Sequence, residues 1–344
     1  MIDIPGTVQT MFLPKGQFRR GYIQSWNVTL ERELPGAIVG SVAYVGTHSV
    51  RQLADWDINA AAPGAGNAGR PLAQKFGRAV ATNLLDGMIG ANYQSLQTTF
   101  DRRFSGGLFL KGAYTFSHAI TENDESGSDS GGTTLSWNHP SVRHRNRATA
   151  GYNRSHVFQM SWLYALPFGP GRKFASGGPA SLLLRDWQVN GLLSSYNGTL
   201  FNVSASGTSL NAPGNTQTAD QVKSKVEKLG GIGSTVSFFD PLAFRSVTEV
   251  RFGTTGRNIL RGPGVVNVNL SVFRSFPMGE RYKLEFRAEA FNATNTPHFG
   301  NPGTNVSNMQ LSPDGSIRSL GGFTTISSAA ADERQYRFAL RLSF

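Results

Sequence analysis

The chain has 344 residues, no cysteine and a formal net charge of +11. Without cysteine it has no disulfide bonds and no thiolate metal sites, and without a run of about 18 apolar residues it has no transmembrane helix. The 40 glycines, the 23 phenylalanines and the low charged fraction of 16% indicate many strands and turns. The basic residues are spread along the chain, so we expect no nucleic-acid partner and attribute the charge to a surface beside anionic lipid.

Nine segments alternate apolar and polar side chains over about ten residues, the length that a tilted barrel strand needs to cross a bilayer. In chain order they are 21–32, 37–46, 93–104, 108–120, 156–165, 186–198, 264–276, 282–292 and 335–344. Residues 1–20 are expected to form an amino-terminal extension and residues 21–344 the barrel portion. A short helix is predicted at 219–229.

The connections alternate between short and long, as expected when all tight turns lie on one membrane face. We therefore predict an all-β fold, an antiparallel transmembrane β-barrel with long extracellular loops and short periplasmic turns. A bacterial barrel closes with an even number of strands. We expect about 9–10 long strands. Because the nine segments found are an odd number, they predict an incomplete barrel, that is, a curved open sheet.

Strand alternation also predicts which side chains face lipid and which face a wet lumen. Arg32, Arg102 and Arg274 have the apolar parity, and each lies beside a predicted tight turn, where its guanidinium can reach the head groups. The candidates for lumen-facing charges are Lys283, Glu285, Arg287, Glu289, Arg337 and Arg341; they could line a transport path or pair across strands to hold the wall. The candidates for an aromatic girdle, or alternatively for core aromatics, are Trp26, Tyr114, Trp162, Tyr164 and Trp187.

No motif predicts a catalytic, cofactor or metal site, and we expect no enzyme activity. The G-x-G-x-x-G pattern at 64–69 lacks the strand before it and the helix after it that nucleotide binding needs. His139, His144 and His156 lack the spacing of a metal or triad motif. The acidic loop 122–131 does not fit an EF-hand, and calcium binding there stays open.

Several segments together resemble a known family. They are YIQSWNVTLERELP at 22–35, VAYVGT at 42–47, RRFSGG at 102–107, YALPFG at 164–169, GRNILRGPG at 256–264, FRAEAFNATN at 286–295, PHFGNP at 297–302 and the terminal strand. Their order and spacing resemble the carboxy-terminal half of Oar-like TonB-dependent outer-membrane receptors.

The resemblance implies a 22-stranded barrel with an amino-terminal plug, through which TonB drives ligand import. The signal peptide, TonB box, plug and earlier strands have no counterpart here, so it implies a carboxy-terminal barrel fragment that TonB reaches only through the missing plug. The implied location is the bacterial outer membrane, and the implied partners are its lipid and lipopolysaccharide, the barrel-assembly machinery and an unknown imported ligand. The residues that match the family's assembly signal are Tyr336, Phe338, Leu340, Leu342 and Phe344.

We therefore expect part of the pore wall and the ligand-binding surface loops of a receptor that actively imports a bulky solute. Two alternatives stay open at this point. A small outer-membrane porin or adhesin would have an even, closed set of strands. A soluble β-rich binding domain would have a dry core between two packed sheets.

Overall fold

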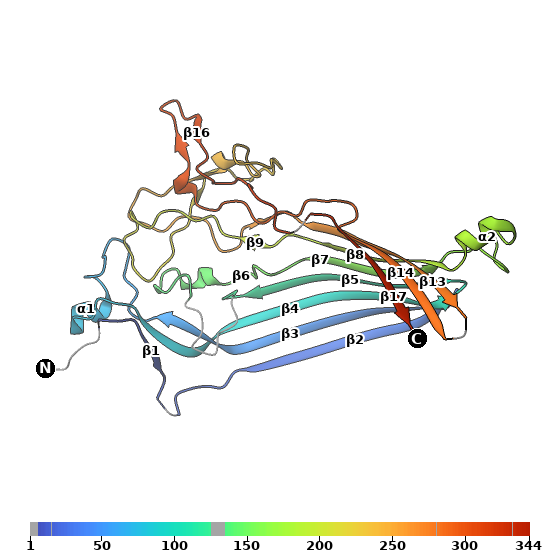
Figure 1. Ribbon diagram of the computed structural model, residues 1–344. Coiled ribbons are helices and arrows are strands. Elements are labelled where there is room, and N and C mark those ends of the chain that lie inside the picture. The colour runs from blue at the N-terminus through green and yellow to red at the C-terminus, as the bar shows by residue number, and fades with distance from the viewer. Residues whose placement is uncertain (1–5, 15, 125–134, 280, 332) are drawn as a thin grey trace.

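The computed structural model describes residues 6–14, 16–124, 135–279, 281–331 and 333–344. Its main element is one sheet in which nine long strands follow one another in chain order, each antiparallel to the next (Figure 1). These strands are β2 (Tyr22–Leu34), β3 (Ile38–Asp57), β4 (Thr82–Ser105), β5 (Leu108–Thr121), β7 (His156–Ala165), β8 (Trp187–Tyr196), β13 (Val265–Met278), β14 (Tyr282–Phe291) and β17 (Gln335–Ser343). All nine predicted strands are confirmed. β3 and β4 extend further than predicted because they continue to pair with each other beyond the other strands.

The remaining elements are short. β1 (Gln9–Phe12) pairs in parallel with β4, so the predicted extension 1–20 contains a strand, and β6 (Ala148–Thr149) pairs with β5. Three two-stranded sheets join β9 (Leu200–Phe201) to β12 (Leu260–Arg261), β10 (Asp220–Gln221) to β11 (Phe244–Arg245) and β15 (Gln310–Leu311) to β16 (Ile317–Ser319). The helices are α1 (Pro71–Phe76), α2 (Gly178–Leu184) and 3-10 turns at Arg143–Asn146, Pro241–Ala243 and Val306–Asn308. No helix in the described ranges is both long enough and apolar enough to span a bilayer.

The predicted helix at 219–229 is wrong. Residues Asp220–Gln221 form β10 instead, which pairs with β11. The carboxylate of Asp220 binds Arg245 and Arg251, both far along the chain. These tertiary contacts override the local preference for a helix.

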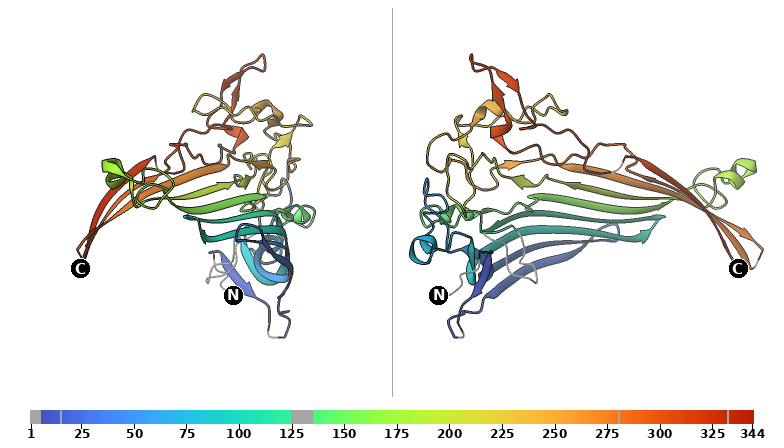
Figure 2. Two further views of the ribbon diagram at one scale, coloured as in Figure 1. Left: turned by 90° about the vertical axis from the view of Figure 1, so that its right-hand side faces the viewer. Right: turned by 60° about the vertical axis from the view of Figure 1, so that its left-hand side comes forward.

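The alternative of a soluble two-sheet sandwich is also wrong for this fold. The described strands form one large sheet, and the other sheets have two strands each and lie in the loops. Figure 2 shows the large sheet as a single curved layer with two free edges, β2 and β17. The long loops gather at one end of it, and the tight turns, α2 and the carboxyl terminus lie at the other. Gly106 and Gly107, with φ of 60° and 84°, form one of these turns, a two-residue connection that suits type I′ geometry.

The register of the sheet shows that its strands are staggered. One row of paired residues crosses all nine strands, from Leu34 at the turn end of β2 to Tyr336 near the loop end of β17. The strand midpoints, Val28 and Ala339, therefore differ by about nine residues over eight strand pairs. With about 3.4 Å per residue and about 4.8 Å between strands, this stagger corresponds to a tilt of about 40°. Outer-membrane barrel strands tilt by about 35–45°.

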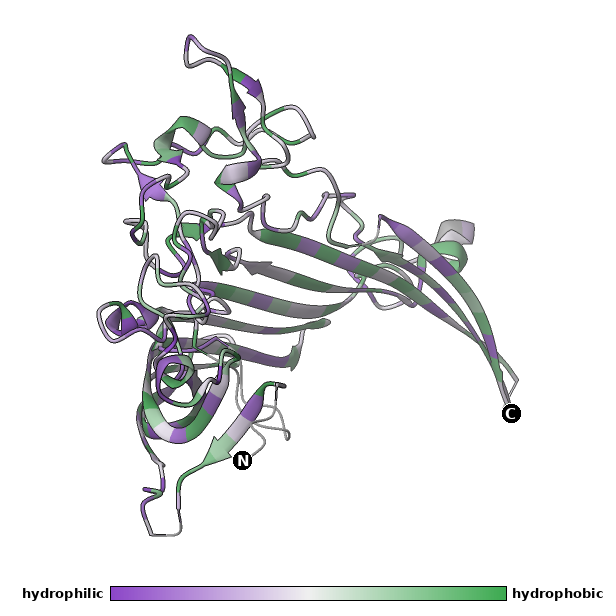
Figure 3. Cartoon of the chain, turned by 90° about the vertical axis from the view of Figure 1, so that its left-hand side faces the viewer, coloured by the Kyte–Doolittle hydropathy of each residue, from purple (hydrophilic) through white to green (hydrophobic). Residues whose placement is uncertain are grey.

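One face of the sheet is apolar, and its large side chains on the edge strands are exposed. Even-numbered residues of the edge strands show this clearly: Val28 is 72% exposed, Leu30 74% and Leu340 69%. Figure 3 shows the alternation of hydrophobic and hydrophilic residues along the strands. Each such side chain would gain about 1.5–3 kcal/mol on leaving water, so a whole apolar face of this kind requires a nonpolar environment such as lipid.

Aromatic rings cover glycines on this apolar face. Trp162 lies directly opposite Gly191 in the register, and a Cβ added to Gly191 would stand 1.9 Å from the indole. The pairs Trp26 with Gly46 and Phe100 with Gly112 repeat the arrangement. A ring lying flat on a glycine compensates for the packing area that the glycine lacks, and it pins the register of the two strands.

Candidate functional site

The long loops fold together into a layer that we call the loop cap, made of residues 58–81, 135–155, 197–264, 292–331 and 333–334 (Figure 1). Among the described residues, the largest buried cluster lies in this cap and not in the sheet: Phe201, Val203, Ala219, Phe238, Phe239, Ala243, Phe244, Leu260, Val306, Phe323 and Ile326. Two loops that are distant in sequence supply it, so each holds the other in place. This core has no counterpart among the predicted elements, although the phenylalanines of 197–264 were a signal for it.

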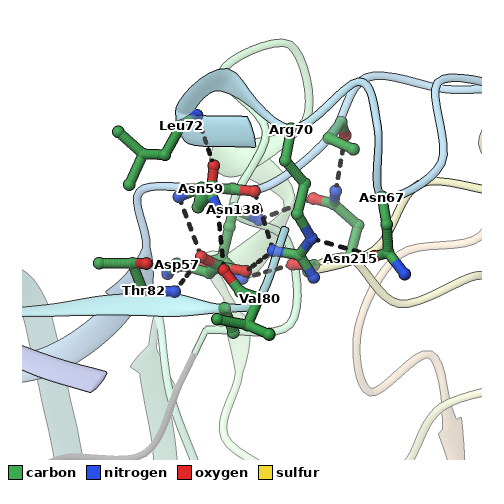
Figure 4. Close-up of polar contacts among 12 residues, drawn as sticks. Asp57, Asn59, Asn67, Arg70, Leu72, Val80, Thr82, Asn138 and Asn215 are labelled. Carbon is green, nitrogen blue, oxygen red and sulfur yellow. Dashed lines mark hydrogen bonds and ion pairs between the residues drawn. The ribbon is translucent and has the colours of Figure 1, made fainter. Parts of the chain in front are cut away.

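A buried ion pair joins the cap to the sheet at the end of β3 (Figure 4). Asp57 Oδ2 accepts from Arg70 Nη1 at 2.9 Å, and the two side chains are 2% and 7% exposed. Asp57 Oδ1 accepts the backbone amides of Asn59 at 2.9 Å and Thr82 at 3.0 Å. The carboxylate therefore binds both ends of loop 58–81, and its charge is matched by Arg70.

Three asparagines extend this network to the other loops. Asn59 donates to the carbonyls of Arg78 and Val80 and accepts from the Leu72 amide. Asn138 accepts from the Asp57 amide at 3.0 Å and donates to Gly214 O at 2.7 Å. The side-chain oxygen of Asn215 accepts from the amides of Asn138 and His139. Loops 58–81, 135–155 and 197–264 are thus fastened at one point.

A second network lies inside loop 197–264. Asp220 accepts from Arg251 Nη2 at 2.7 Å and forms a 3.1 Å ion pair with Arg245. Glu249 lies on the exposed side of the same two arginines. The hydrogen bond from Arg251, with the charges of both arginines, lowers the pKa of Asp220 below its ordinary value, although burial opposes the shift.

Part of the acidic loop 122–131 takes part in a third network. Asp124 accepts from the Gly151 amide and from Asn258 Nδ2, each at 2.7 Å, and lies 3.9 Å from Arg257. Glu125 and Asp129 of this loop lie outside the described residues. Among the described residues, no three carboxylate or histidine side chains gather as a metal site would require.

Two of the cavities between the sheet and the cap are lined mainly by loop residues. One of about 440 Å³ lies beside the Asp57–Arg70 pair, with Asn83, Asn138 and Asn215 in its wall. The other, of about 280 Å³, lies where the ends of β8 and β13 meet the cap, and is lined by Arg154, Tyr196, Thr199, His298 and Asn301 among others. Both offer hydrogen-bonding groups and suit a polar solute more than an apolar one.

The second cavity has Arg154 in its wall, and a further arginine, Arg261, lies nearby. The guanidinium of Arg154 stacks 4.1 Å above the ring of Tyr196 and donates to Asn197 O. Arg261 donates to Asn153 O and Gly198 O. Neither arginine has a carboxylate partner within the described part of the chain. Burial lowers the pKa of Arg261, and the nearby charge of Arg154 lowers it further.

The predicted lumen-facing charges lie on the face of the sheet opposite the apolar face, to which Leu284 and Phe286 belong. In the register of β14 and β17, Glu285 is paired with Arg341 and Glu289 with Arg337. Five of the six predicted residues, Glu285, Arg287, Glu289, Arg337 and Arg341, line a groove of about 230 Å³ with Ala339. The sixth, Lys283, pairs with Ser343 at the turn end.

Some of these charges pair with each other. Arg287 is 2.9 Å from Glu285 and stacks 4.6 Å from the ring of Phe273. Arg337 is 3.9 Å from Glu289. These contacts are compatible with both roles considered for the charges, a transport path and an ion-paired wall.

The girdle candidates lie on the apolar face, four of them at two levels. Trp162, Tyr164 and Trp187 lie at or near the turn ends of β7 and β8, whereas Trp26 lies toward the loop end of β2. Tyr114 lies at the middle of β5. The hydroxyl of Tyr114 is 2.7 Å from His156 Nδ1. Two levels are what a girdle requires, and the assignment stays a prediction.

Two of the arginines on the apolar face find protein partners. Arg102 donates to the turn carbonyls Gly36 O and Leu108 O. Arg274 donates to Leu182 O and Leu183 O at the end of α2. The guanidinium groups therefore satisfy backbone carbonyls. The sequence predicted contact with lipid head groups and did not predict these hydrogen bonds.

The remaining sequence features make contacts within the loops or lie on the terminal strand. The amides of Gly64 and Gly66 in the G-x-G-x-x-G segment donate to Leu210 O and Asn211 O, so they are not free to hold a phosphate. His139 Nδ1 contacts Ser141 Oγ, its neighbour in the loop. The terminal apolar residues are exposed, four on the edge strand β17 and the last directly after it: Tyr336, Phe338, Leu340, Leu342 and Phe344. Their assembly role stays a prediction.

Several solved structures are similar to the chain at low sequence identity. The chain matches "Structure of the FpvAI-pyocin S2 complex" with 12% identity, 93% of this chain, 26% of that chain and a TM-score of 0.43. It matches P. aeruginosa FpvA bound to heterologous pyoverdines with 11% identity, 93% and 27% coverage and a TM-score of 0.44. It matches the outer membrane transporter YddB from Escherichia coli with 6% identity, 97% and 34% coverage and a TM-score of 0.48.

The chain thus spans about a quarter to a third of the length of these three proteins. No curated protein matches its sequence. A family model described as an outer membrane beta barrel domain matches residues 3–337. The match extends over the loop cap and over the nine long strands except the end of β17. The chain therefore belongs to the outer membrane beta-barrel domain family, and its place is the bacterial outer membrane.

Proposed function

We propose that the chain is the carboxy-terminal wall of an Oar-like TonB-dependent receptor that imports a bulky solute. In this proposal residues 21–344 form the barrel portion, residues 1–20 precede it, and the loop cap carries the ligand-binding surface on the extracellular side. Import would be driven by TonB through a plug supplied by the rest of the receptor. The proposal assigns no catalytic step to the chain.

The loop cap is the observation that carries the proposal. A passive pore needs an open mouth, whereas these loops share a hydrophobic core and are fastened by the Asp57, Asp124 and Asp220 networks. Polar cavities open between this ordered layer and the sheet. Such a surface suits selective recognition of a large polar solute before it enters the barrel.

The charged face of β14 and β17 supports the same function. A groove of mixed charge on the face opposite the apolar one suits a wet interior. The six charges Lys283, Glu285, Arg287, Glu289, Arg337 and Arg341 would contact the plug or the passing solute. The outer-membrane partners would be lipid and lipopolysaccharide around the apolar face and the barrel-assembly machinery at β17.

Two measurements on the intact parent protein test the proposal. In a liposome-swelling assay with arabinose as the probe, we expect no passive entry, because the loops and a plug close the barrel. In cells, a growth or uptake phenotype of a deletion at the native locus should be reproduced by deleting TonB. Rapid swelling, or a phenotype that does not depend on TonB, would instead support a porin or an adhesin.

A further inference from the structure

Helix α2, on the connection between β7 and β8, exposes three consecutive leucines. Leu182, Leu183 and Leu184 are 58%, 68% and 43% exposed. The helix lies beyond the tight-turn end of the sheet (Figure 1). In water, three large apolar side chains on seven residues would be unfavourable, since nothing in the described structure covers them.

Side chains of the apolar face hold this helix at the turn end of the sheet. Arg274 donates to the carbonyls of Leu182 and Leu183, and Trp187 Nε1 donates to Leu183 O at 3.0 Å. The guanidinium of Arg274 also lies 4.4 Å from the ring of Phe276 and 5.5 Å from that of Trp187. These hydrogen bonds satisfy carbonyls at the carboxyl end of α2, and the positive charge suits that end of the helix dipole.

Both anchoring residues belong to the apolar face. Arg274 and Trp187 are opposite each other in the register of β13 and β8, and Trp187 packs edge-on against Phe286 of β14. The leucines of α2 therefore continue the apolar face beyond its turn end. Whatever covers that face meets α2 at its boundary.

The charges around α2 indicate what the boundary is. Arg172, Lys173 and Arg185 stand on the same connection, and Asp186 is its acidic residue, 3.7 Å from Arg185. Arg172 and Lys173 are exposed. Leucines with nearby exposed cations are the pattern of a segment that lies in a membrane interface and attracts anionic head groups.

We propose that α2 is an interfacial anchor that inserts Leu182, Leu183 and Leu184 into the phospholipid leaflet on the tight-turn side, with Arg172 and Lys173 bound to anionic head groups. The anchor would fix the depth of the β7–β8 connection in the membrane. The assignment to the inner leaflet rests on the orientation given under the proposed function, whereas insertion itself does not.

A fluorescence experiment tests the insertion in the intact parent protein. Because this chain has no cysteine, Leu183→Cys introduces a single site here for an NBD label, provided that the parent is cysteine-free elsewhere or made so. The protein is reconstituted in vesicles of phosphatidylethanolamine and phosphatidylglycerol that contain nitroxide lipids. Leu340→Cys on the apolar face is the membrane control, and Ser316→Cys in the β15–β16 hairpin is the aqueous control.

We expect the label at 183 to be quenched by acyl-chain nitroxides at a depth of roughly 5–10 Å below the head groups. The double substitution Arg172→Gln and Lys173→Gln should lower the ratio of quenching of this label by nitroxide-labelled phosphatidylglycerol to quenching by nitroxide-labelled phosphatidylethanolamine. We expect a decrease of up to about fivefold for each charge removed. A label at 183 that iodide quenches as it does at 316, or that neither lipid nor iodide quenches, would overturn the anchor. Neither result would bear on TonB-dependent import.

Discussion

The ion pair between Asp57 and Arg70 allows a quantitative test of how the loop cap is held. In Asp57→Asn the side-chain oxygen can still accept the amides of Asn59 and Thr82, which are 2.9 and 3.0 Å from it in the wild type. What is lost is the negative charge 2.9 Å from Arg70, whose side chain is 7% exposed. Removing one partner of a buried pair costs about 3–5 kcal/mol, because the other charge remains buried and unmatched.

We take the lower value, about 3 kcal/mol, because the neighbouring cavity allows water to reach Arg70. At about 1.4 kcal/mol for each factor of ten, the opening equilibrium of loop 58–81 should rise by about 100-fold. Hydrogen exchange at the Asn59 and Thr82 amides in the intact, detergent-solubilised protein measures this directly. The sheet itself should keep its protection, since its strands do not depend on this pair.

The matched control is Asp101→Asn on the sheet surface. Asp101 lies 3.7 Å from Lys111, and both side chains are largely exposed, so the loss should be at most about 1 kcal/mol. Adding Arg70→Met to Asp57→Asn should recover part of the protection by removing the unmatched charge. Unchanged exchange in Asp57→Asn, or no recovery in the double variant, would refute the reasoning.

Three further predictions concern the sheet, the cap and the terminal strand. Gly191→Ala should force the indole of Trp162 off the strand and lower the free energy of unfolding in urea by about 1–3 kcal/mol. Gly90→Ala, whose added methyl group meets only ordinary contacts, should change this free energy little. Equal effects of the two substitutions would reject the ring-on-glycine contact. Because the pKa of Asp220 lies below its ordinary value of 3.8, its carboxylate stabilises the cap above about pH 4, and this contribution disappears as the pH falls through the lowered pKa. In Asp220→Asn, hydrogen exchange of the cap amides should be faster at pH 7 and should respond less to acid. An unaltered acid response would contradict the assignment. Deleting Phe344 in the intact parent should reduce the amount assembled in the outer membrane, and wild-type levels on immunoblots would exclude an assembly role.

The sequence by itself determined the strands, their faces and the two ends of the sheet. Strand alternation is a local property with a period of two. The two faces of a segment such as Gln335–Ser343 can therefore be predicted from that segment alone. Turn residues such as Gly106 and Gly107 likewise act over a few positions. The charged residues of β14 and β17 met in one groove because alternation and an antiparallel register are enough to bring them together.

The tertiary structure alone decided the loop cap and the contacts that hold α2. Asp57, Asn138 and Asn215 are far apart in the chain, and no period or motif relates them. The same holds for Phe201 and Phe323 in the core of the cap, and for Arg274, whose carbonyl partners lie 91 and 92 residues away. Irregular loops have no repeating geometry that converts sequence spacing into proximity. Their contacts arise from the balance of burial, charge pairing and chain entropy once the sheet has brought the loop ends together.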